Sequence, residues 1–229
     1  MAFKHSCAGA SGIKDKLYAY YVKVTVLNLP LHDILSLCSI INILLMNTDL
    51  LLLINGWAGH SHLLDTVMLF MAKYAIFILF AVAVYCVGYY IYKKEWKSVA
   101  YFATTLVVTF ILLKLAALLN FDHRPFMDHH LTQLLSHTSG SSFPSDHTTA
   151  GTGAAMAVLL FTKFKKTGWI LLFAAALIGF SRIFVGVHYP ADIAGGLITG
   201  TLGGSLVYLA KHFIDGQKHT KVAFTDHMR

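Results

Sequence analysis

A short segment late in the chain contains residue types that could transfer a phosphoryl group: Arg182, His188 and Asp192, between two long apolar runs. Ionisable groups at such a place usually face a cavity and one another, because burying them is costly. A polar loop at a membrane surface would explain one of these charges but not the set. Pro190 suits the first turn of a helix, so Asp192 would lie one turn along from His188. The carboxylate could then accept the imidazole N–H and hold the other ring nitrogen outward as a nucleophile, while Arg182 offers donors for phosphate.

A second polar segment, residues 120–146, ends just before an apolar helix. Ser145 is typical of a helix N-cap and Asp146 of a first turn, which by themselves indicate only a helix start. However, a helix N-terminus also binds anions through its free N–H groups. The imidazole of His147 could protonate a leaving oxygen beside such an anion. The two segments together therefore predict a phosphoryl-transfer site.

The composition determines which elements must position these residues. Of the 229 residues, 56% are hydrophobic and 13% are charged, which indicates a polytopic membrane protein rather than a soluble domain. The net charge of +7 comes from lysines and arginines that flank apolar runs. Because no basic stripe with interleaved aromatics is present, contact with anionic lipid headgroups is favoured over nucleic acid. The three cysteines have no metal-type spacing and indicate no disulfide framework.

The apolar runs predict an all-α, polytopic membrane helix bundle with the active site at the extracytoplasmic ends of the helices. Residues 34–56 form either a further span or a helix lying in the interface. Lys73 falls inside a long run, where it either extends poorly to the surface or faces a polar cavity. Gly196, Gly200 and Gly204 recur every fourth residue and predict close helix packing. Apart from residues 34–56, five spans are expected: 64–92, 98–119, 147–162, 168–186 and 190–213.

Lysines concentrate in the connections 93–97 and 163–166 and after the last span. The positive-inside rule puts these in the cytoplasm, so the loop 120–146 and the turn 187–190 face the extracytoplasmic side of the plasma (inner) membrane. We expect three parts along the chain: a partly disordered or interfacial N-terminal extension, a membrane phosphatase domain and a cytoplasmic tail, over residues 1–45, 46–214 and 215–229.

The motifs resemble those of the type 2 phosphatidic acid phosphatase superfamily of membrane phosphatases. That family has a lysine upstream of Arg-Pro, then Pro-Ser-Gly-His, then Ser-Arg followed by a histidine and an aspartate. The resemblance covers roughly residues 64–210. The matching residues here are Arg124-Pro125, Pro144-Ser145-Asp146-His147, Ser181-Arg182, His188 and Asp192.

The resemblance implies a role for each matching residue. His188 would attack phosphorus and form a phosphohistidine, and Asp192 would orient it. His147 would protonate the departing oxygen and then activate water. Two imidazoles in these roles need no metal, so we expect neither a metal nor a cofactor. The phosphoryl oxygens would be held by backbone N–H groups and by Arg124, Ser145 and Arg182. The other loop histidines match no standard zinc spacing and are expected to be solvated: His123, His129, His130 and His137.

The chain departs from the family pattern at two positions. Ala117 stands where the family has its lysine, and Lys114, about one helical turn earlier, either reaches the same pocket or extends to the interface. Asp146 replaces the glycine, and its carboxylate would repel phosphate unless it turns away or contacts an arginine. The Pro-Ser-Asp-His variant, with residues 55–59 and Leu64-Asp65, resembles the undecaprenyl-diphosphatase branch associated with bacitracin resistance.

The sequence therefore predicts a phosphatase that converts undecaprenyl diphosphate into undecaprenyl phosphate and inorganic phosphate, recycling a cell-wall lipid carrier. The alternative substrates are phosphatidylglycerophosphate and phosphatidic acid. A transporter or non-enzymatic binding protein would not need the positioned set of His147, His188 and Asp192. The expected partners are the isoprenoid lipid diphosphate and membrane lipids, with no nucleic acid and no obligate protein partner.

Overall fold

The computed structural model describes residues 47–119, 123–137 and 140–227. The chain divides into two units, Met1–Met46 and Asn47–Arg229, and all described residues belong to the second. Within the described ranges the elements are helices, and β-type pairing is limited to an isolated bridge between His123 and Ser141. The predicted all-α class is confirmed.

Four of the five predicted spans are helices long and apolar enough to cross a membrane. The fifth, α7 (Asp146–Phe161), is helical as predicted but has only 16 residues. A helix of that length extends about 24 Å, less than the roughly 30 Å hydrocarbon core of a bilayer. The four spanning helices among the described residues are α4 (Ala75–Tyr92), α5 (Trp96–Ala117), α8 (Lys165–Phe184) and the Pro190–Asp215 part of α9 (Pro190–His227).

The prediction of one continuous helix over residues 64–92 is wrong. The segment is divided at Tyr74 into α3 (His62–Lys73) and α4. Lys73 therefore ends a helix instead of lying within a span. Its side chain is exposed, and its Nζ lies 5.1 Å from the centre of the Tyr74 ring. Lys73 is therefore not buried in a membrane span.

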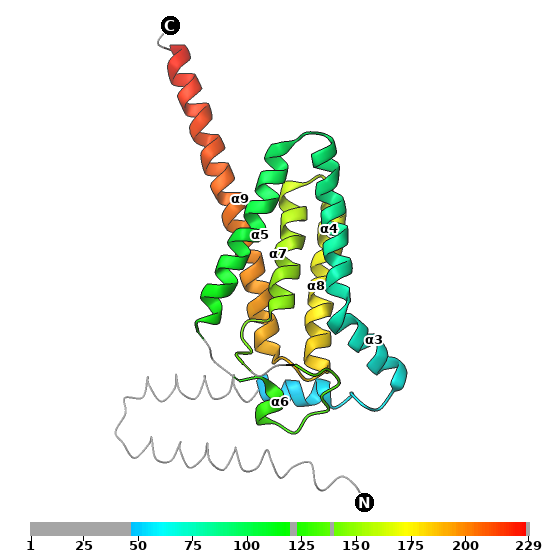
Figure 1. Cartoon of the computed structure of the whole chain (residues 1–229). Helices are drawn as coiled ribbons and strands as arrows, with labels where there is room; N and C mark the ends of the chain where they lie inside the picture. The colour runs from blue at the N-terminus through cyan, green and yellow to red at the C-terminus, as the bar shows by residue number, and fades with distance from the viewer. Residues whose placement is uncertain (1–46, 120–122, 138–139, 228–229) are drawn as a thin grey trace, which may run out of the picture. The chain divides into compact units, whose positions relative to one another are not determined.

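The central element of the bundle is α7, which contacts α4, α5, α8 and α9 (Figure 1). Most of its residues are buried, and they are mainly glycine, alanine and threonine. A helix that is buried on every side needs small side chains where its neighbours approach closely. The surrounding spans therefore fix the position of α7 and of the polar residues at its N-terminus.

The predicted close packing through the glycines of α9 is confirmed. A Cβ atom added at any of these glycines would lie 2.6 to 2.9 Å from a Cβ atom of α7. At these positions the backbone of α9 therefore contacts side chains of α7 directly. The three facing pairs advance together by one turn: Gly196 with Thr148, Gly200 with Thr152, and Gly204 with Met156.

The polar segments meet at one end of the bundle, where α7 and α9 begin and α8 ends (Figure 1). The short helix α6 (Pro125–Asp128) lies there, as do the helical residues 47–55, which bury Leu51 and Ile54 in an apolar cluster with Phe184. The earlier part of the predicted segment 34–56 lies outside the described residues.

The C-terminal helix α9 continues to His227, so the predicted cytoplasmic tail, residues 215–229, is mostly helical.

Replacing Gly200 with alanine should destabilise the bundle by about 1–3 kcal/mol, because the new Cβ would lie 2.8 Å from the Thr149 carbonyl oxygen and 2.9 Å from the Gly153 nitrogen. Gly88→Ala is the matched control, since a Cβ there meets nothing within 4 Å. Thermal unfolding in detergent should show a lower midpoint for Gly200→Ala only. Equal midpoints for both variants would contradict this packing.

Candidate active site

His188 and Asp192 form a buried pair where α8 passes into α9. Pro190 is the first residue of α9, and Asp192 lies in its first turn, as predicted. The His188 Nδ1 atom lies 3.2 Å from Asp192 Oδ2, and both residues are only 2% exposed. A proton on Nδ1 can be donated to the carboxylate, which leaves the Nε2 lone pair directed away from Asp192. Such an arrangement prepares an imidazole for nucleophilic attack.

Burial lowers the pKa of His188, although the hydrogen bond and negative charge of Asp192 act in the opposite direction. The positive charges of Arg182 and Arg124 lower this pKa further. The imidazole is therefore held in its neutral form at neutral pH. Only the neutral ring has the free nitrogen that nucleophilic attack requires.

Ser142 also contacts this pair. Its hydroxyl donates a short hydrogen bond to Asp192 Oδ2 and lies 3.4 Å from His188 Nδ1. The same carboxylate oxygen accepts the backbone N–H of Tyr189 at 2.8 Å. Because Ser142 is 1% exposed, water does not compete for these contacts. Asp192 is thus oriented by a backbone donor from the segment that links it to His188 and by a side-chain donor from the loop before α7.

Arg124 reaches the other nitrogen of the same imidazole. Its Nη1 donates to the Val187 carbonyl oxygen at 3.2 Å and lies 3.5 Å from His188 Nε2. Pro125 starts α6 immediately after Arg124, and the bridge between His123 and Ser141 joins the two sides of the loop. Burial lowers the pKa of Arg124, and the charges of Asp146 and Asp192 oppose this effect. A group with such a high ordinary pKa remains a cation at neutral pH.

Arg182 enters from the last turn of α8 and is 3% exposed. Its Nη1 donates to the Ala72 carbonyl oxygen at 3.0 Å. Ala72 belongs to the last turn of α3, where carbonyl groups lack partners within the helix. The break between α3 and α4 therefore supplies the acceptor that orients Arg182.

Both arginines are buried without a paired carboxylate among the described residues. Their Nε atoms also have no hydrogen-bond partner there. Leaving buried, charged donors unsatisfied is costly unless a bound anion supplies the missing oxygens. Arginine donors suit phosphate oxygens because they lie in one plane. The site can therefore accept a phosphoryl group beside His188.

Ser145 and His147 lie at the start of α7, as predicted. Ser145 is the N-cap residue, but its hydroxyl does not cap the helix and instead lies 3.1 Å from Thr148 Oγ1. The backbone N–H of Ser145 donates to the Asp192 carbonyl oxygen at 3.1 Å, which joins the starts of α7 and α9. Burial and the positive charge of Arg182 lower the pKa of His147 to about 4.

The structure brings six of the seven predicted site residues to this end of the bundle, and Lys114 is the exception. Lys114 is exposed in the last turn of α5, with its Nζ 5.3 Å from the centre of the Phe110 ring. No hydrogen bond or ion pair joins it to the other described site residues. Asp146 is exposed in the first turn of α7. The residues brought together are Arg124, Ser145, His147, Arg182, His188 and Asp192.

Asn55 holds the loop that carries Arg124 against the end of α8. Its Oδ1 accepts the Thr132 N–H at 3.0 Å, and its Nδ2 donates to the carbonyl oxygens of Thr132 at 3.0 Å and Phe184 at 2.8 Å. Asn55 is 3% exposed. The Asn55 amide thus bonds backbone groups of both the loop and the end of α8, and it fixes the distance between them.

The loop histidines do not form a metal site within the described ranges. No group of three histidine, cysteine or carboxylate side chains there is arranged to hold a metal ion. The His129 ring meets the Tyr189 ring edge-on at 6.1 Å, and His123 and His130 are exposed. His137 is close enough for its charge to lower the pKa of His147.

The comparison with known families agrees with this geometry. The family model described as the PAP2 superfamily matches residues 96–214, more than half of the chain. The chain belongs to this superfamily. The match spans α5 through the membrane part of α9 and so includes all six residues brought together above.

Individual PAP2 relatives give the same result. Undecaprenyl-diphosphatase BcrC from Bacillus subtilis (strain 168) is 34% identical over 174 residues, which cover 74% of this chain and 89% of the relative. The bacitracin transport permease protein BcrC from Bacillus licheniformis is 34% identical over 71% of this chain and 79% of the relative. The crystal structure of Aquifex aeolicus LpxE has a TM-score of 0.58 and 26% identity, covering 71% of this chain and 94% of that one. The protein is therefore a membrane-spanning PAP2 phosphatase.

Two positioning residues are absent from the sequence-based prediction. Ser142 lies only three positions before Ser145, but serines are common in polar loops and nothing in its spacing points to Asp192. Asn55 falls in an apolar run, where a lone amide is a signal for a buried hydrogen-bonding role. Its partners, however, are backbone groups far along the chain, and a sequence does not identify them.

Ser142→Ala should lower kcat for phosphate release roughly ten- to hundredfold, because a hydrogen bond to a charged group contributes about 1.5–3 kcal/mol. KM should change little, because the phosphate donors of Arg124 and Arg182 keep their backbone anchors. Ser141→Ala is the control, because Ser141 is exposed and its hydroxyl donates only to the Phe143 carbonyl oxygen. A rise in KM with an unchanged kcat would contradict this role for Ser142.

Binding of a tetrahedral dianion should raise the pKa of His147 from about 4, because a nearby negative charge favours the imidazolium. Binding near pH 6 should therefore take up protons. Calorimetric titration with tungstate, in two buffers of different ionisation enthalpy, measures this uptake. His147→Gln should reduce it, whereas the same uptake in the variant would exclude His147 as the group that gains the proton.

Proposed function

We propose that this PAP2 phosphatase hydrolyses undecaprenyl diphosphate to undecaprenyl phosphate and inorganic phosphate through a phosphohistidine at His188. The observation that carries the mechanism is the orientation of the His188 imidazole. Nδ1 lies against Asp192, and Nε2 faces Arg124 beside two buried guanidinium groups that have no carboxylate partner among the described residues. A neutral nucleophile next to a phosphate-binding pair is what nucleophilic phosphoryl transfer requires.

In the first step, His188 Nε2 attacks the terminal phosphorus, and the bond from phosphorus to the bridging oxygen breaks. The Nδ1 proton stays on the ring, so the phosphorylated imidazole is positively charged and is stabilised by Asp192. Arg124 and Arg182 bind the phosphoryl oxygens and offset the charge that accumulates in the transition state. The protonated form of His147 donates its proton to the departing oxygen of undecaprenyl phosphate.

In the second step, the neutral His147 takes a proton from water as the water oxygen attacks phosphorus. The bond from phosphorus to Nε2 breaks, which releases inorganic phosphate and returns His188 to its neutral form. His147 thus regains the proton that it gave up in the first step. The lowered pKa of His147 suits the second role, and a bound dianion, by raising that pKa, suits the first.

The substrate assignment draws support from the relatives. One relative is an undecaprenyl-diphosphatase, and another carries bacitracin in its name. We therefore infer that the chain recycles the cell-wall lipid carrier and supports bacitracin resistance. A lipid diphosphate also suits a site at the end of a bundle of membrane-spanning helices, because its tail can stay in the bilayer while its headgroup enters the site.

We further propose that the active site faces the extracytoplasmic side of the plasma membrane. The lysine-rich connections 93–97 and 163–166 are at the opposite end of α7 from His147, and the positive-inside rule favours the cytoplasm for such connections. We also propose residues 46–214 as the phosphatase domain, after an N-terminal extension over 1–45, and the positive-inside rule favours the cytoplasm for the segment 215–229.

The deciding experiment measures phosphate release from undecaprenyl diphosphate by the full-length protein in detergent with EDTA present. The wild type should release phosphate, and His188→Ala should not. His130→Gln is the control, because this histidine is exposed on the same loop as Arg124. Release that continues in His188→Ala would exclude the proposed nucleophile. Release from phosphatidylglycerophosphate, but not from the diphosphate, would retain the mechanism and change the substrate.

A phosphoenzyme trap tests the intermediate and separates hydrolysis from transport. Protein mixed with terminally labelled substrate and quenched in base should retain label, since phosphohistidine survives base and is lost in acid. Detergent removes any compartment, so labelled protein cannot result from transport. Absence of label from a variant that still binds substrate but turns over slowly, such as His147→Gln, would contradict a covalent intermediate.

A further inference from the structure

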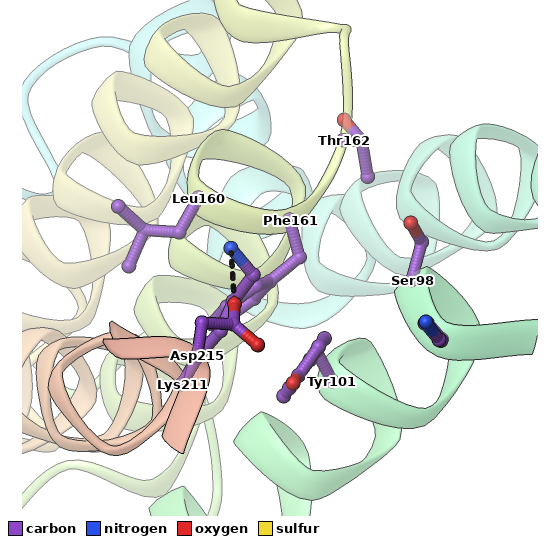
Figure 2. A pocket seen from close by; sticks show the side chains of 8 residues that line it. Ser98, Tyr101, Leu160, Phe161, Thr162, Lys211 and Asp215 are labelled. Atoms are coloured by element: carbon purple, nitrogen blue, oxygen red, sulfur yellow. Dashed lines mark ion pairs between the residues drawn. The ribbon is translucent and has the colours of Figure 1, made fainter. Parts of the chain in front are cut away.

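A cavity of about 350 Å³ lies at the end of the bundle remote from His188. It lies between the start of α5, the end of α7 and the middle of α9 (Figure 2). Because the active site is at the start of α7, roughly the 24 Å length of that helix separates it from this cavity. The residues that line it are Lys97, Ser98, Tyr101, Leu160, Phe161, Thr162, Lys211 and Asp215.

The inner part of this cavity is aromatic and rigid. The Tyr101 and Phe161 rings are stacked, with centres 5.4 Å apart and planes inclined by 19°. Phe161 is buried, and Thr162 beside it donates its hydroxyl proton to the Val158 carbonyl oxygen at 2.7 Å. The lining therefore has a fixed shape on the side of α7.

The outer part carries two lysines that are available to a ligand. Lys211 forms a half-exposed ion pair with Asp215, at 3.6 Å, drawn as the dashed line in Figure 2. A pair of this kind contributes little in water and is easily exchanged. Lys97 is exposed and has no hydrogen bond, ion pair or ring contact among the described residues.

Neighbouring lysines at the same end are already engaged. Lys163 and Lys93 have their Nζ atoms 3.7 and 5.9 Å from the centre of the Tyr89 ring. Lys165 donates to the carbonyl oxygens of Leu159 and Leu160 at the end of α7. Within the cavity, Lys97 and Lys211 thus provide two cationic groups from different helices, close to the hydroxyl groups of Ser98 and Tyr101.

We propose that this cavity binds the phosphate headgroup of an anionic membrane lipid between Lys97 and Lys211. A basic pocket between membrane-spanning helices suits such a headgroup. Tyr208 lies one helical turn before Lys211 on the same side of α9, is 37% exposed and has its ring centre 6.4 Å from that of Phe161, so it offers apolar surface on which an acyl chain can pack. A free phosphate ion would gain only the two solvated lysine contacts, so the lipid is the favoured source of the phosphate.

The test compares full-length protein in nanodiscs of phosphatidylcholine alone with nanodiscs that contain phosphatidylglycerol. Phosphatidylglycerol should raise the melting temperature of the wild type, because a ligand that binds only the folded state stabilises it. The double variant Lys97→Gln/Lys211→Gln should lose most of this increase and bind a short-chain phosphatidylglycerol about tenfold more weakly. Its phosphatase activity in phosphatidylcholine should match that of the wild type, which verifies folding.

Two matched variants make the test specific. Asp215→Asn should strengthen binding, because it removes a carboxylate that competes for Lys211. Lys166→Gln removes an exposed charge from the same end of the bundle but outside the cavity, and should leave the increase intact. An equal loss in Lys166→Gln would overturn the proposal in favour of diffuse surface attraction. Equal stabilisation by inorganic phosphate in phosphatidylcholine nanodiscs would overturn the lipid assignment.

Discussion

The backbone contact between α7 and α9 is the constraint on which the rest of the structure depends. Gly196, Gly200 and Gly204 allow the two helices to approach until side-chain atoms of α7 meet the backbone of α9. The same approach lets the Ser145 N–H bond to the Asp192 carbonyl oxygen. Residues from two motifs far apart in the chain are therefore held in one fixed register, which pre-organised catalysis requires.

Electrostatics and burial then act together at the end of this helix pair. The arginines are oriented by neutral carbonyl oxygens, and no carboxylate in the described part of the chain lies within bonding distance to cancel their positive charge. Burial strengthens the effect of this charge because little water screens it. The same charge favours the neutral imidazole of His188 before an anion binds. One arrangement thus serves both anion binding and nucleophile preparation.

Sequence patterns were sufficient to predict the helices and to single out six residues that the fold brings to one end of the bundle, because apolar length and local motif spacing encode them. They did not predict features that depend on contacts between residues far apart in the chain. No proline or glycine marks the break at Tyr74, and its role emerges only from the contact between Ala72 and Arg182. Lys114 was the one site candidate based on a missing family residue, and its exposed position follows from the rotation of α5 in the bundle. Ser142 was missed because its partner Asp192 lies on another helix.

The use of main-chain acceptors for both arginines affects how this site tolerates sequence change. Every amino acid carries a carbonyl group, so substitutions at Ala72 or Val187 that preserve the backbone path leave the acceptors of Arg182 and Arg124 in place. The anchors of the two guanidinium groups are therefore determined by chain geometry instead of side-chain identity. Comparison of related sequences by residue type alone would overlook both positions, however important they are for the site.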